Sequence, residues 1–307
     1  MTRIALCFPG QGSQAAGMAE GLLDQPLARA LLDVAATDGL DLEAALAGTD
    51  DQLRPTQVAQ PALVFVELVL AAALPAGLEV VGVAGHSVGE YAAVSAAGAY
   101  RPEDALRLVI RRGREMAAMT EGTMAAVVGI AEDVVETACA EVRRDGEVVV
   151  VANLNAPGQV VISGTAAAVE RASGLALQRG ARRVIPLNVS GPFHSPLMAP
   201  AAARFAAVLA AAPHDPLRVP VACNVTGAPV ERAADLPGLL GRQLDSPVRW
   251  ADCVTTLVGL GAELLVEVGP GAVLSGLARR IAPQARTAGV DSLEAAAGLA
   301  AVAVGAA

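Results

Sequence analysis

The sequence predicts an α/β fold in which a mostly parallel sheet carries an inserted antiparallel unit. Strand-like apolar runs alternate with helical patterns in the first and last parts of the chain, and that alternation is typical of a parallel sheet. Between about residues 122 and 189 the order changes to strand, helix, strand, strand, helix, strand, which is the ferredoxin-like motif. The 307 residues, 54% of them hydrophobic, suffice for one large and one small domain.

Before the insertion, the elements follow from apolar patterns and from the residues that interrupt them. The run at 3–8 is almost entirely apolar and ends in a glycine-rich loop, as a buried strand does. Gly98 ends one helix, and Pro102 is a favoured first-turn residue of the next. The elements expected here are a strand at 3–8, helices at 26–36 and 60–74, a strand at 78–84, and helices at 88–97 and 102–119.

The remaining elements follow from the same patterns. In the insertion we expect a strand at 124–129, a helix at 131–143, strands at 147–153 and 159–163, a helix at 165–179 and a strand at 182–189. After it we expect a helix at 200–212, strands at 219–224 and 264–268, and, beyond a Gly-Pro-Gly turn, a final helix that carries Arg279 and Arg280. The predicted domains are a core of residues 1–122 and 194–307 and a subdomain of residues 123–193.

The composition excludes several classes of protein. All 22 basic residues are arginine, which rules out a Schiff-base enzyme and a phosphate loop ending in Gly-Lys-Ser/Thr. The net charge of −9 argues against a nucleic-acid partner. No apolar stretch is long enough to span a bilayer, and the four cysteines are too widely spaced for a metal site. We therefore expect a cytoplasmic protein with reduced thiols, no metal and no membrane partner.

Residues 85–89, Gly-His-Ser-Val-Gly, match the G-x-S-x-G pattern of a nucleophile elbow. They lie between an expected strand and an expected helix, where a tight turn lifts the serine out of the sheet. The helix N-terminus then presents peptide N–H groups, that of Val88 among them, to a developing oxyanion. The alternative is a chance match in a glycine-rich chain; the matching context favours Ser87 as a nucleophile.

A nucleophilic serine needs a base, and the chain has three histidines. His86 adjoins the serine, where neighbouring side chains point apart, and is expected to be a packing residue. His214 lies in a Pro-His-Asp-Pro turn that is expected to be solvated. His194 remains as the base. Because an α/β-hydrolase places its histidine late, after an acid, and no histidine follows residue 214, an ordinary esterase is disfavoured.

The loop after the first strand is a second candidate site. Gly10, Gly12 and Ala15 satisfy the dinucleotide fingerprint, but residues 26–36 are helical where that fingerprint requires a second strand. A better interpretation is a backbone-rich loop that presents Gln11 as a second oxyanion donor. The alternative is a simple tight turn.

Arg112 differs from the other arginines of its helix. At about 100° per residue, its neighbouring arginines point away from the apolar face, whereas Arg112 falls about 60° from Val109, within that face. A buried guanidinium needs an anionic partner, because leaving it unpaired costs several kcal/mol. Two interpretations stand equal at this point: a structural ion pair, or a clamp on a substrate carboxylate.

Together these residues resemble the malonyl-CoA:acyl-carrier-protein transacylases of fatty acid synthesis and the discrete acyltransferases of polyketide synthases. The resemblance runs from residue 8 to about residue 280. It rests on FPGQGSQ at 8–14, QPAL at 60–63, GHSVGEY at 85–91, RRGREM at 111–116, NLNAPGQVVISG at 153–164, FHS at 193–195, NVTG at 224–227, QLDSPVRW at 243–250 and EVGPG at 267–271.

The resemblance implies a role for each candidate. Ser87 would attack the malonyl thioester of coenzyme A, and His194 would take its proton and later activate the pantetheine thiol of an acyl carrier protein. Gln11 and the Val88 N–H would hold the oxyanion. Gln243 would lie beside His194 and orient its imidazole in place of the usual acid.

The resemblance also bears on specificity and fold. Arg112 would grip the free carboxylate of malonate, and Val88 and Phe193 would suit a malonyl rather than a methylmalonyl group. The fold would be an α/β-hydrolase-like core, with the ferredoxin-like subdomain roofing the cleft. Malonyl-CoA would be a substrate, with no bound cofactor, and the chain would act as a monomer.

Two other functions remain open on the sequence: a thioesterase or proofreading hydrolase that gives the acyl group to water, and a non-catalytic carrier-binding subunit. Acyl carrier proteins are acidic, so a chain of net charge −9 needs a local basic surface to bind one. We expect an arginine patch near the cleft mouth, drawn from Arg111, Arg114, Arg182, Arg183, Arg279 and Arg280.

Overall fold

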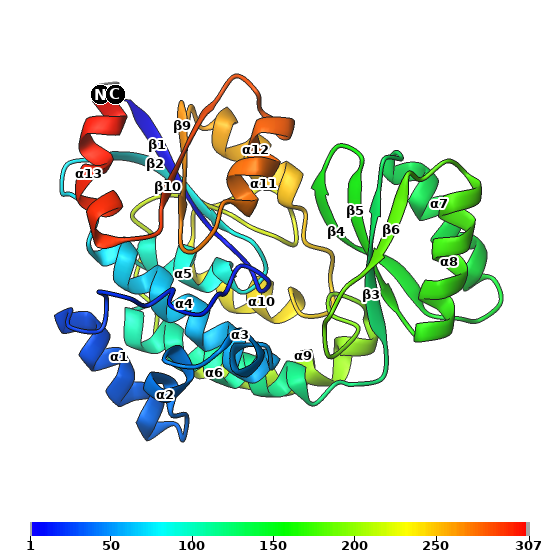
Figure 1. Cartoon of the computed structure of the whole chain (residues 1–307), viewed down its shortest axis with the longest axis horizontal. Helices are drawn as coiled ribbons and strands as arrows, with labels where there is room; N and C mark the ends of the chain where they lie inside the picture. Colours follow the sequence, from blue (N-terminus) through cyan, green and yellow to red (C-terminus); the bar gives the residue numbers. More distant parts are fainter. Residues whose placement is uncertain (1, 305–307) are drawn as a thin grey trace.

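The structure, a computed structural model, describes residues 2–304; residues 1 and 305–307 of the predicted core lie outside the described residues. Two units lie side by side in Figure 1. One holds both ends of the chain and a six-stranded sheet, and the other, drawn in green, holds a four-stranded sheet from the middle of the sequence. The predicted α/β class, with a main parallel sheet and a separate antiparallel one, is confirmed.

The main sheet has the strand order β10-β9-β1-β2-β7-β8. Its strands are β1 (Arg3–Phe8), β2 (Glu79–Gly85), β7 (Val221–Ala222), β8 (Pro229–Val230), β9 (Leu264–Val268) and β10 (Arg286–Val290). Neighbouring strands are parallel except β7 and β8. Parallel strands in the middle of a sheet are covered on both faces, which accounts for the nearly unbroken apolar sequences of β1 and β9.

Helices cover both faces of this sheet. Alternate side chains of β1 belong to two separate cores: Ile4, Leu6 and Phe8 pack with α4, α5 and α6, whereas Ala5 and Cys7 pack with α11 and α12. The helices of this unit are α1 (Pro26–Thr37), α2 (Leu42–Leu46), α3 (Asp50–Leu53), α4 (Thr56–Ala72), α5 (Gly89–Ala96), α6 (Pro102–Ala117), α9 (Ala199–Ala211), α10 (Leu236–Arg242), α11 (Trp250–Gly259), α12 (Val273–Ile281) and α13 (Leu293–Val304), with 3₁₀ turns at Pro196–Met198 and Ala233–Asp235.

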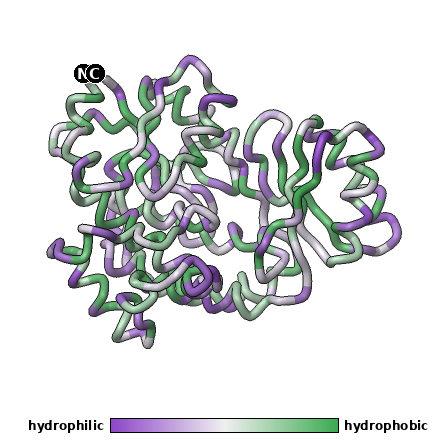
Figure 2. The backbone as a smooth tube through the Cα atoms, viewed as in Figure 1, coloured by the Kyte–Doolittle hydropathy of each residue, from purple (hydrophilic) through white to green (hydrophobic). Residues whose placement is uncertain are grey.

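The second sheet is antiparallel throughout, in the order β4-β5-β3-β6. Its elements are β3 (Thr123–Val128), α7 (Glu132–Arg143), β4 (Val149–Ala156), β5 (Gln159–Gly164), α8 (Ala166–Gln178) and β6 (Arg183–Pro186). Val127 and Ile162 pack against α7 and α8. Met124 and Val161 lie on the opposite face of the sheet and pack into the core of the main unit. Figure 2 shows hydrophobic residues along the strands of both units and hydrophilic ones at the outer turns.

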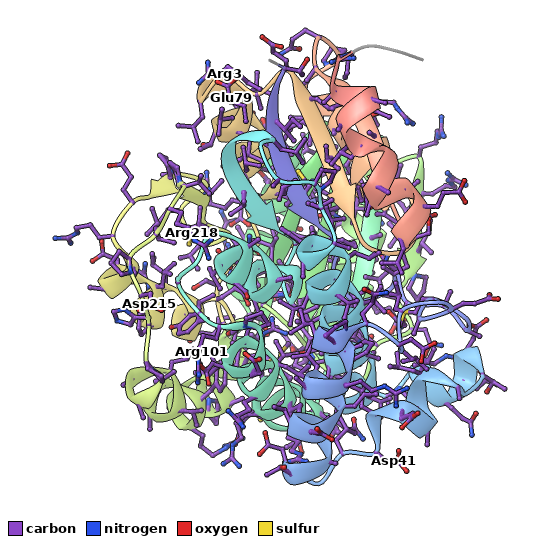
Figure 3. All side chains as sticks on the ribbon, turned by 90° about the vertical axis from the view of Figure 1, so that its left-hand side faces the viewer. Arg3, Asp41, Glu79, Arg101, Asp215 and Arg218 are labelled. Atoms are coloured by element: carbon purple, nitrogen blue, oxygen red, sulfur yellow. The ribbon has the colours of Figure 1, made fainter. Side chains whose placement is uncertain are left out.

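The two ends of the main sheet differ in chemistry. At the amino ends of β1 and β2, Arg3 and Glu79 form an exposed ion pair with Nε and Oε1 3.8 Å apart, at the top of Figure 3. The carboxyl ends of the same strands lead into the Gln11 loop and into Ser87. Ligands bind at the carboxyl ends of strands in open α/β sheets, so this end is where a site is expected.

The structure differs from the sequence prediction at several elements. Helix α12 is not the last, because β10 and α13 follow it. The strand predicted at 219–224 is only two residues long in the structure, since β7 pairs with β2 at a single position, Val83–Val221. Helix α4 begins at Thr56, with Pro61 inside it, rather than at the residue before the proline. Helices α10 and α11 were not predicted, because their apolar periodicity is short.

Within residues 2–304, no helix combines the length and the apolar character that a bilayer-spanning segment requires.

Candidate active site

Ser87 occupies a strained turn between β2 and α5, with a positive φ of 51°. The two glycines of the pattern make the turn possible. A Cβ on Gly85 would lie 2.0 Å from the backbone of Gly89, and a Cβ on Gly89 would lie 2.3 Å from the Phe8 carbonyl oxygen. The strand, the helix and β1 therefore approach too closely for any other residue, as a nucleophile elbow requires.

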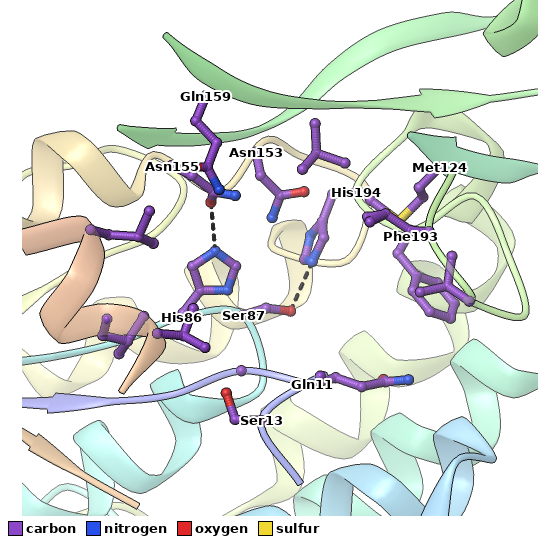
Figure 4. Close-up of a pocket in the computed structure, with 18 residues that line it drawn as sticks. Gln11, Ser13, His86, Ser87, Met124, Asn153, Asn155, Gln159, Phe193 and His194 are labelled. Atoms are coloured by element: carbon purple, nitrogen blue, oxygen red, sulfur yellow. Dashed lines mark hydrogen bonds between the residues drawn. The ribbon is translucent and has the colours of Figure 1, made fainter. Parts of the chain in front are cut away.

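His194 reaches Ser87 from the far side of the cleft, where the chain returns from the second sheet. Its Nε2 lies 2.8 Å from Ser87 Oγ (Figure 4). Its Nδ1–H donates to the main-chain carbonyl of Gln243 at 2.8 Å. Burial, reinforced by the Arg112 charge, lowers the pKa of His194 to about 3. The imidazole is therefore neutral near pH 7, with Nε2 free to accept the serine proton.

Arg112 is fully buried, as its helical position predicts. Its Nη1 donates to Gln60 Oε1 at 2.7 Å, and its Nη2 donates to Gln243 Oε1 at 2.9 Å and to Ser87 Oγ at 3.1 Å. The Nε has no partner, and no carboxylate of residues 2–304 pairs with the guanidinium. The structural ion pair is thus absent from the described part of the chain, and a fully buried cation beside Ser87 Oγ is without an anionic partner there.

Two peptide N–H groups are available to an oxyanion. Val88 precedes the first residue of α5, and neither its N–H nor that of Gln11 meets an acceptor within residues 2–304. The side chain of Gln11 turns away from Ser87 (Figure 4). Its Nε2 donates to Thr56 Oγ1 at 3.2 Å. Any oxyanion contact from Gln11 is therefore a main-chain one.

Gln243 lies beside His194, but its side chain does not contact the imidazole. Only its main-chain carbonyl does so, while its Nε2 donates to the Ser87 carbonyl at 2.9 Å and to Glu90 Oε2. The side chain thus connects Ser87, Arg112 and Glu90. The direction of a side chain depends on the backbone path at residue 243, which no sequence pattern specifies.

Two residues of the site were not singled out from the sequence. Asn224 Oδ1 accepts the Ser87 N–H at 2.8 Å, and Asn224 Nδ2 donates to the Gly85 carbonyl at 2.7 Å. Glu90 accepts the Asn224 N–H at 2.9 Å. Both lie in motifs quoted above, GHSVGEY and NVTG. The sequence signal that could have singled out Glu90 is its position: it is a carboxylate directly after Gly89, in an otherwise apolar helix.

A cavity of about 240 Å³ opens above the serine. Apolar side chains of both units line it, including Phe193, which is almost fully buried, and Val273, which is half-exposed at the rim. His86 was expected to be a packing residue; it lines this cavity and its Nε2 bonds Asn155 Oδ1 at 2.9 Å (Figure 4). His214 is exposed, as predicted for a solvated turn.

No group of three or more His, Cys, Asp or Glu side chains within residues 2–304 is arranged to hold a metal ion. The four cysteines are buried and unpaired by disulfides.

Comparison with known proteins gives similarity over nearly the whole chain. A family model described as "Acyl transferase domain" matches residues 6–296. The "Malonyl CoA-acyl carrier protein transacylase" of Bacillus subtilis (strain 168) is 42% identical over 304 residues, which cover 96% of this chain and 95% of the relative. The corresponding protein of Escherichia coli (strain K12) is 41% identical, over 92% of this chain and 93% of the relative.

Solved structures give the same result. The acyl-carrier-protein S-malonyltransferase of Bartonella henselae superimposes with a TM-score of 0.91 at 38% identity, covering 99% of this chain and 100% of that one. A malonyl transacylase in complex with the acyl carrier protein of a type II polyketide synthase superimposes with a TM-score of 0.89 at 36% identity, covering 96% and 98%.

Proposed function

Since the chain belongs to the malonyl-CoA:acyl-carrier-protein transacylase family, we propose that it moves a malonyl group from coenzyme A to the phosphopantetheine thiol of an acyl carrier protein. One observation carries this proposal: the Ser87–His194 pair, 2.8 Å apart, directly adjoins the unpaired guanidinium of Arg112. Ester or thioester cleavage needs only the pair. An acyl group that itself ends in a carboxylate also needs a cation at this place.

In the first half-reaction Ser87 Oγ attacks the thioester carbonyl while His194 Nε2 takes the hydroxyl proton. The Gln243 carbonyl holds the Nδ1–H, which fixes the tautomer and supports the imidazolium that forms. The N–H groups of Val88 and Gln11 receive the oxyanion. When the tetrahedral adduct collapses, the C–S bond breaks and the proton passes from His194 to the departing coenzyme A sulfur.

The second half-reaction reverses these steps with another thiol. His194 Nε2 takes the proton of the pantetheine thiol, the sulfur attacks the malonyl ester, and the proton returns to Ser87 Oγ as the C–O bond breaks. Throughout both halves Arg112 holds the free malonyl carboxylate, and Phe193 bounds the acyl cavity. All the groups that the transfer needs come from this one chain, which supports a monomeric enzyme with coenzyme A as carrier of the substrate and no separate cofactor.

The proposal also covers the fold type of the two units and the cellular location of the protein. The antiparallel order β4-β5-β3-β6 with two helices on one face supports a ferredoxin-like subdomain at 123–193, and the elbow at the end of β2 supports an α/β-hydrolase-like core at 1–122 and 194–307. Four buried free thiols suit the cytoplasm, and the net charge of −9 disfavours nucleic-acid and anionic membrane partners.

Labelled malonyl-CoA tests the proposal directly. The protein should retain the label on Ser87 and release it to a holo carrier protein, while Ser87→Ala should retain none. Label that appears as free malonate at the same rate with and without the carrier would indicate a hydrolase instead. An intact protein that neither takes up nor passes on the label would leave only a carrier-binding role.

A further inference from the structure

Glu90 lies directly beneath the nucleophile, in the first turn of α5, and is almost fully buried. One carboxylate oxygen, Oε1, accepts the N–H of Asn224 at 2.9 Å, and the other accepts the side-chain amide of Gln243. Neither partner carries a charge. A buried carboxylate without a paired cation is costly, so its presence here calls for a reason.

Through those two partners Glu90 is connected to every reacting group. Asn224 holds the N–H of Ser87 at 2.8 Å, and the Gln243 carbonyl holds His194 Nδ1 at 2.8 Å. The side-chain amide of Gln243 lies between the two buried charges, since its oxygen accepts from Arg112 at 2.9 Å and its nitrogen donates to Glu90. One neutral amide therefore separates a buried cation from a buried anion.

The titratable groups around the Glu90 carboxylate come from several elements. Arg112 faces it from α6, the thiols of Cys223 and Cys253 from the β7 end and α11, and the phenol of Tyr91 from its own helix. Burial raises the pKa of both thiols and of the phenol, so that they are neutral near pH 7. His194, bonded to the other side of Gln243, is neutral as well.

Among the site residues the charges therefore balance when Glu90 is ionised: Arg112 contributes one positive charge and Glu90 one negative charge. A malonyl carboxylate bound to Arg112 adds a second negative charge to the same buried region. The described residues that hydrogen-bond Arg112 are Gln60, Ser87 and Gln243, and none of them supplies a second cation. Two carboxylates near one cation cannot both remain ionised without a large electrostatic penalty.

We infer that Glu90 takes up a proton from solvent when the malonyl carboxylate binds Arg112, so that the buried site stays neutral and the Gln243 amide keeps its position under Ser87. In this role Glu90 is a positioning residue, and its protonation leaves Arg112 as the only buried charge that the malonyl carboxylate meets. The inference rests on the proposed function, because it needs a malonyl group on Arg112.

The direction of the pH effect follows from the environment of Glu90. Burial raises the pKa of Glu90 to about 7, and the Arg112 charge is among the influences that hold it down. A malonyl carboxylate on Arg112 weakens that influence, and the pKa of Glu90 rises further. Proton uptake on binding is then small at pH 6, where Glu90 is already protonated, and approaches about one proton above pH 7. Over that range the Kd for malonyl-CoA increases with pH by up to about tenfold per unit.

Calorimetry on the Ser87→Ala variant measures the proton uptake on ligand binding without turnover. Malonyl-CoA is titrated at pH 6 and pH 8 in buffers of different ionisation enthalpy, with acetyl-CoA as the matched ligand, because it has the same coenzyme moiety and lacks the carboxylate. We expect an excess uptake of about one proton for malonyl-CoA over acetyl-CoA at pH 8, and little excess at pH 6.

Two double variants identify the residue that takes up the proton. Adding Glu90→Gln to Ser87→Ala should abolish the excess uptake, whereas adding His194→Gln should preserve it. The inference is overturned if the excess proton uptake disappears with His194→Gln and survives Glu90→Gln. Equal proton uptake for both ligands on Ser87→Ala also overturns it, and this second test does not depend on any substitution at Glu90. If the wild-type protein transfers malonyl groups and Ser87→Ala shows no excess uptake, this inference alone is refuted. If the wild-type protein fails to transfer them, the proposed function is refuted.

Discussion

At the scale of single residues, the site depends on groups whose neighbours keep them uncharged or unpaired. His194, the proposed base, is neutral because burial and the Arg112 charge both disfavour its protonated form. The charge of Arg112 is not neutralised by its partners Gln60 and Gln243, which are neutral amides that orient the guanidinium. A carboxylate at either position would satisfy Arg112 and remove the reason for an anionic ligand to bind.

Replacing Arg112 should separate recognition of the carboxylate from the chemistry. In Arg112→Ala, kcat/KM for malonyl transfer should fall by about 10²–10³-fold, since a buried charge-assisted contact of about 3–4 kcal/mol is lost. The activity on acetyl-CoA should rise relative to that on malonyl-CoA. Steady-state kinetics with both thioesters checks this.

Arg111→Ala is the matched control, because Arg111 lies on the same helix, is exposed and pairs with Glu115 at 3.1 Å. It should change neither rate by more than about twofold. Equal losses on malonyl- and acetyl-CoA in Arg112→Ala would contradict the carboxylate clamp.

At the scale of elements, the turn between β2 and α5 holds Ser87, the proposed nucleophile, through close backbone packing. Gly85 and Gly89 let the strand, the helix and β1 approach one another, and Asn224 satisfies the Ser87 N–H and the Gly85 carbonyl that the turn leaves free. The positive φ values of Ser87 and His194 are the only ones among non-glycine residues within 2–304. Local strain thus coincides with the two residues of the proposed catalytic pair.

Adding one methyl group at the elbow tests this packing. Gly85→Ala should lower the free energy of unfolding by more than about 3 kcal/mol, because its Cβ would meet the Gly89 backbone at 2.0 Å and neither segment can move away. Urea denaturation followed by circular dichroism measures the change.

Gly174→Ala, in the interior of α8, provides the comparison. Its Cβ would meet nothing within 4 Å, so the better helix propensity of alanine should leave the protein as stable or up to about 1 kcal/mol more stable. If the Gly85→Ala protein were as stable as the Gly174→Ala protein, the close backbone packing at Gly85 would be contradicted.

At the scale of the whole molecule, the cleft lies between the two units, and arginines gather near it. Arg182, Arg183 and Arg280 line one hollow together with the exposed Ile185, and Gln159 lines both this hollow and the catalytic cavity. The other three arginines of the expected patch do not line this hollow: Arg111 pairs with Glu115, Arg114 bonds the Asp38 carbonyl and Arg279 bonds Thr287. That the six arginines form a carrier-binding patch stays a prediction.

Charge reversal tests whether this hollow receives the carrier. Arg183→Glu and Arg280→Glu should each raise the KM for holo carrier protein by about fivefold or more at low salt, with the effect shrinking as salt increases. Loading of Ser87 by malonyl-CoA, measured separately, shows whether the first half-reaction is intact. Arg29→Glu, on α1 away from the second unit in Figure 1, makes the same change in net charge and should leave the KM unchanged. A KM unaffected by both reversals would place the carrier on another surface.

Much of the fold and of the site follows from the sequence alone. The alternation of strands and helices gave the fold class, the scarcity of histidines singled out His194, and helical periodicity put Arg112 on a buried face, where the structure has it. These features are local or compositional, so a single sequence contains them. Composition also limited carboxylate recognition to arginine, since the chain has no lysine.

Only the tertiary structure decided how these residues cooperate. That the main chain rather than the side chain of Gln243 holds His194, and that its amide lies between Arg112 and Glu90, depends on segments that are distant in sequence meeting at the carboxyl end of one sheet. Short strands such as β7 and β10 likewise form where a neighbouring strand supplies the hydrogen bonds. Hydrogen-bond direction and strand pairing are set by the path of the backbone, and that path is a property of the folded chain as a whole.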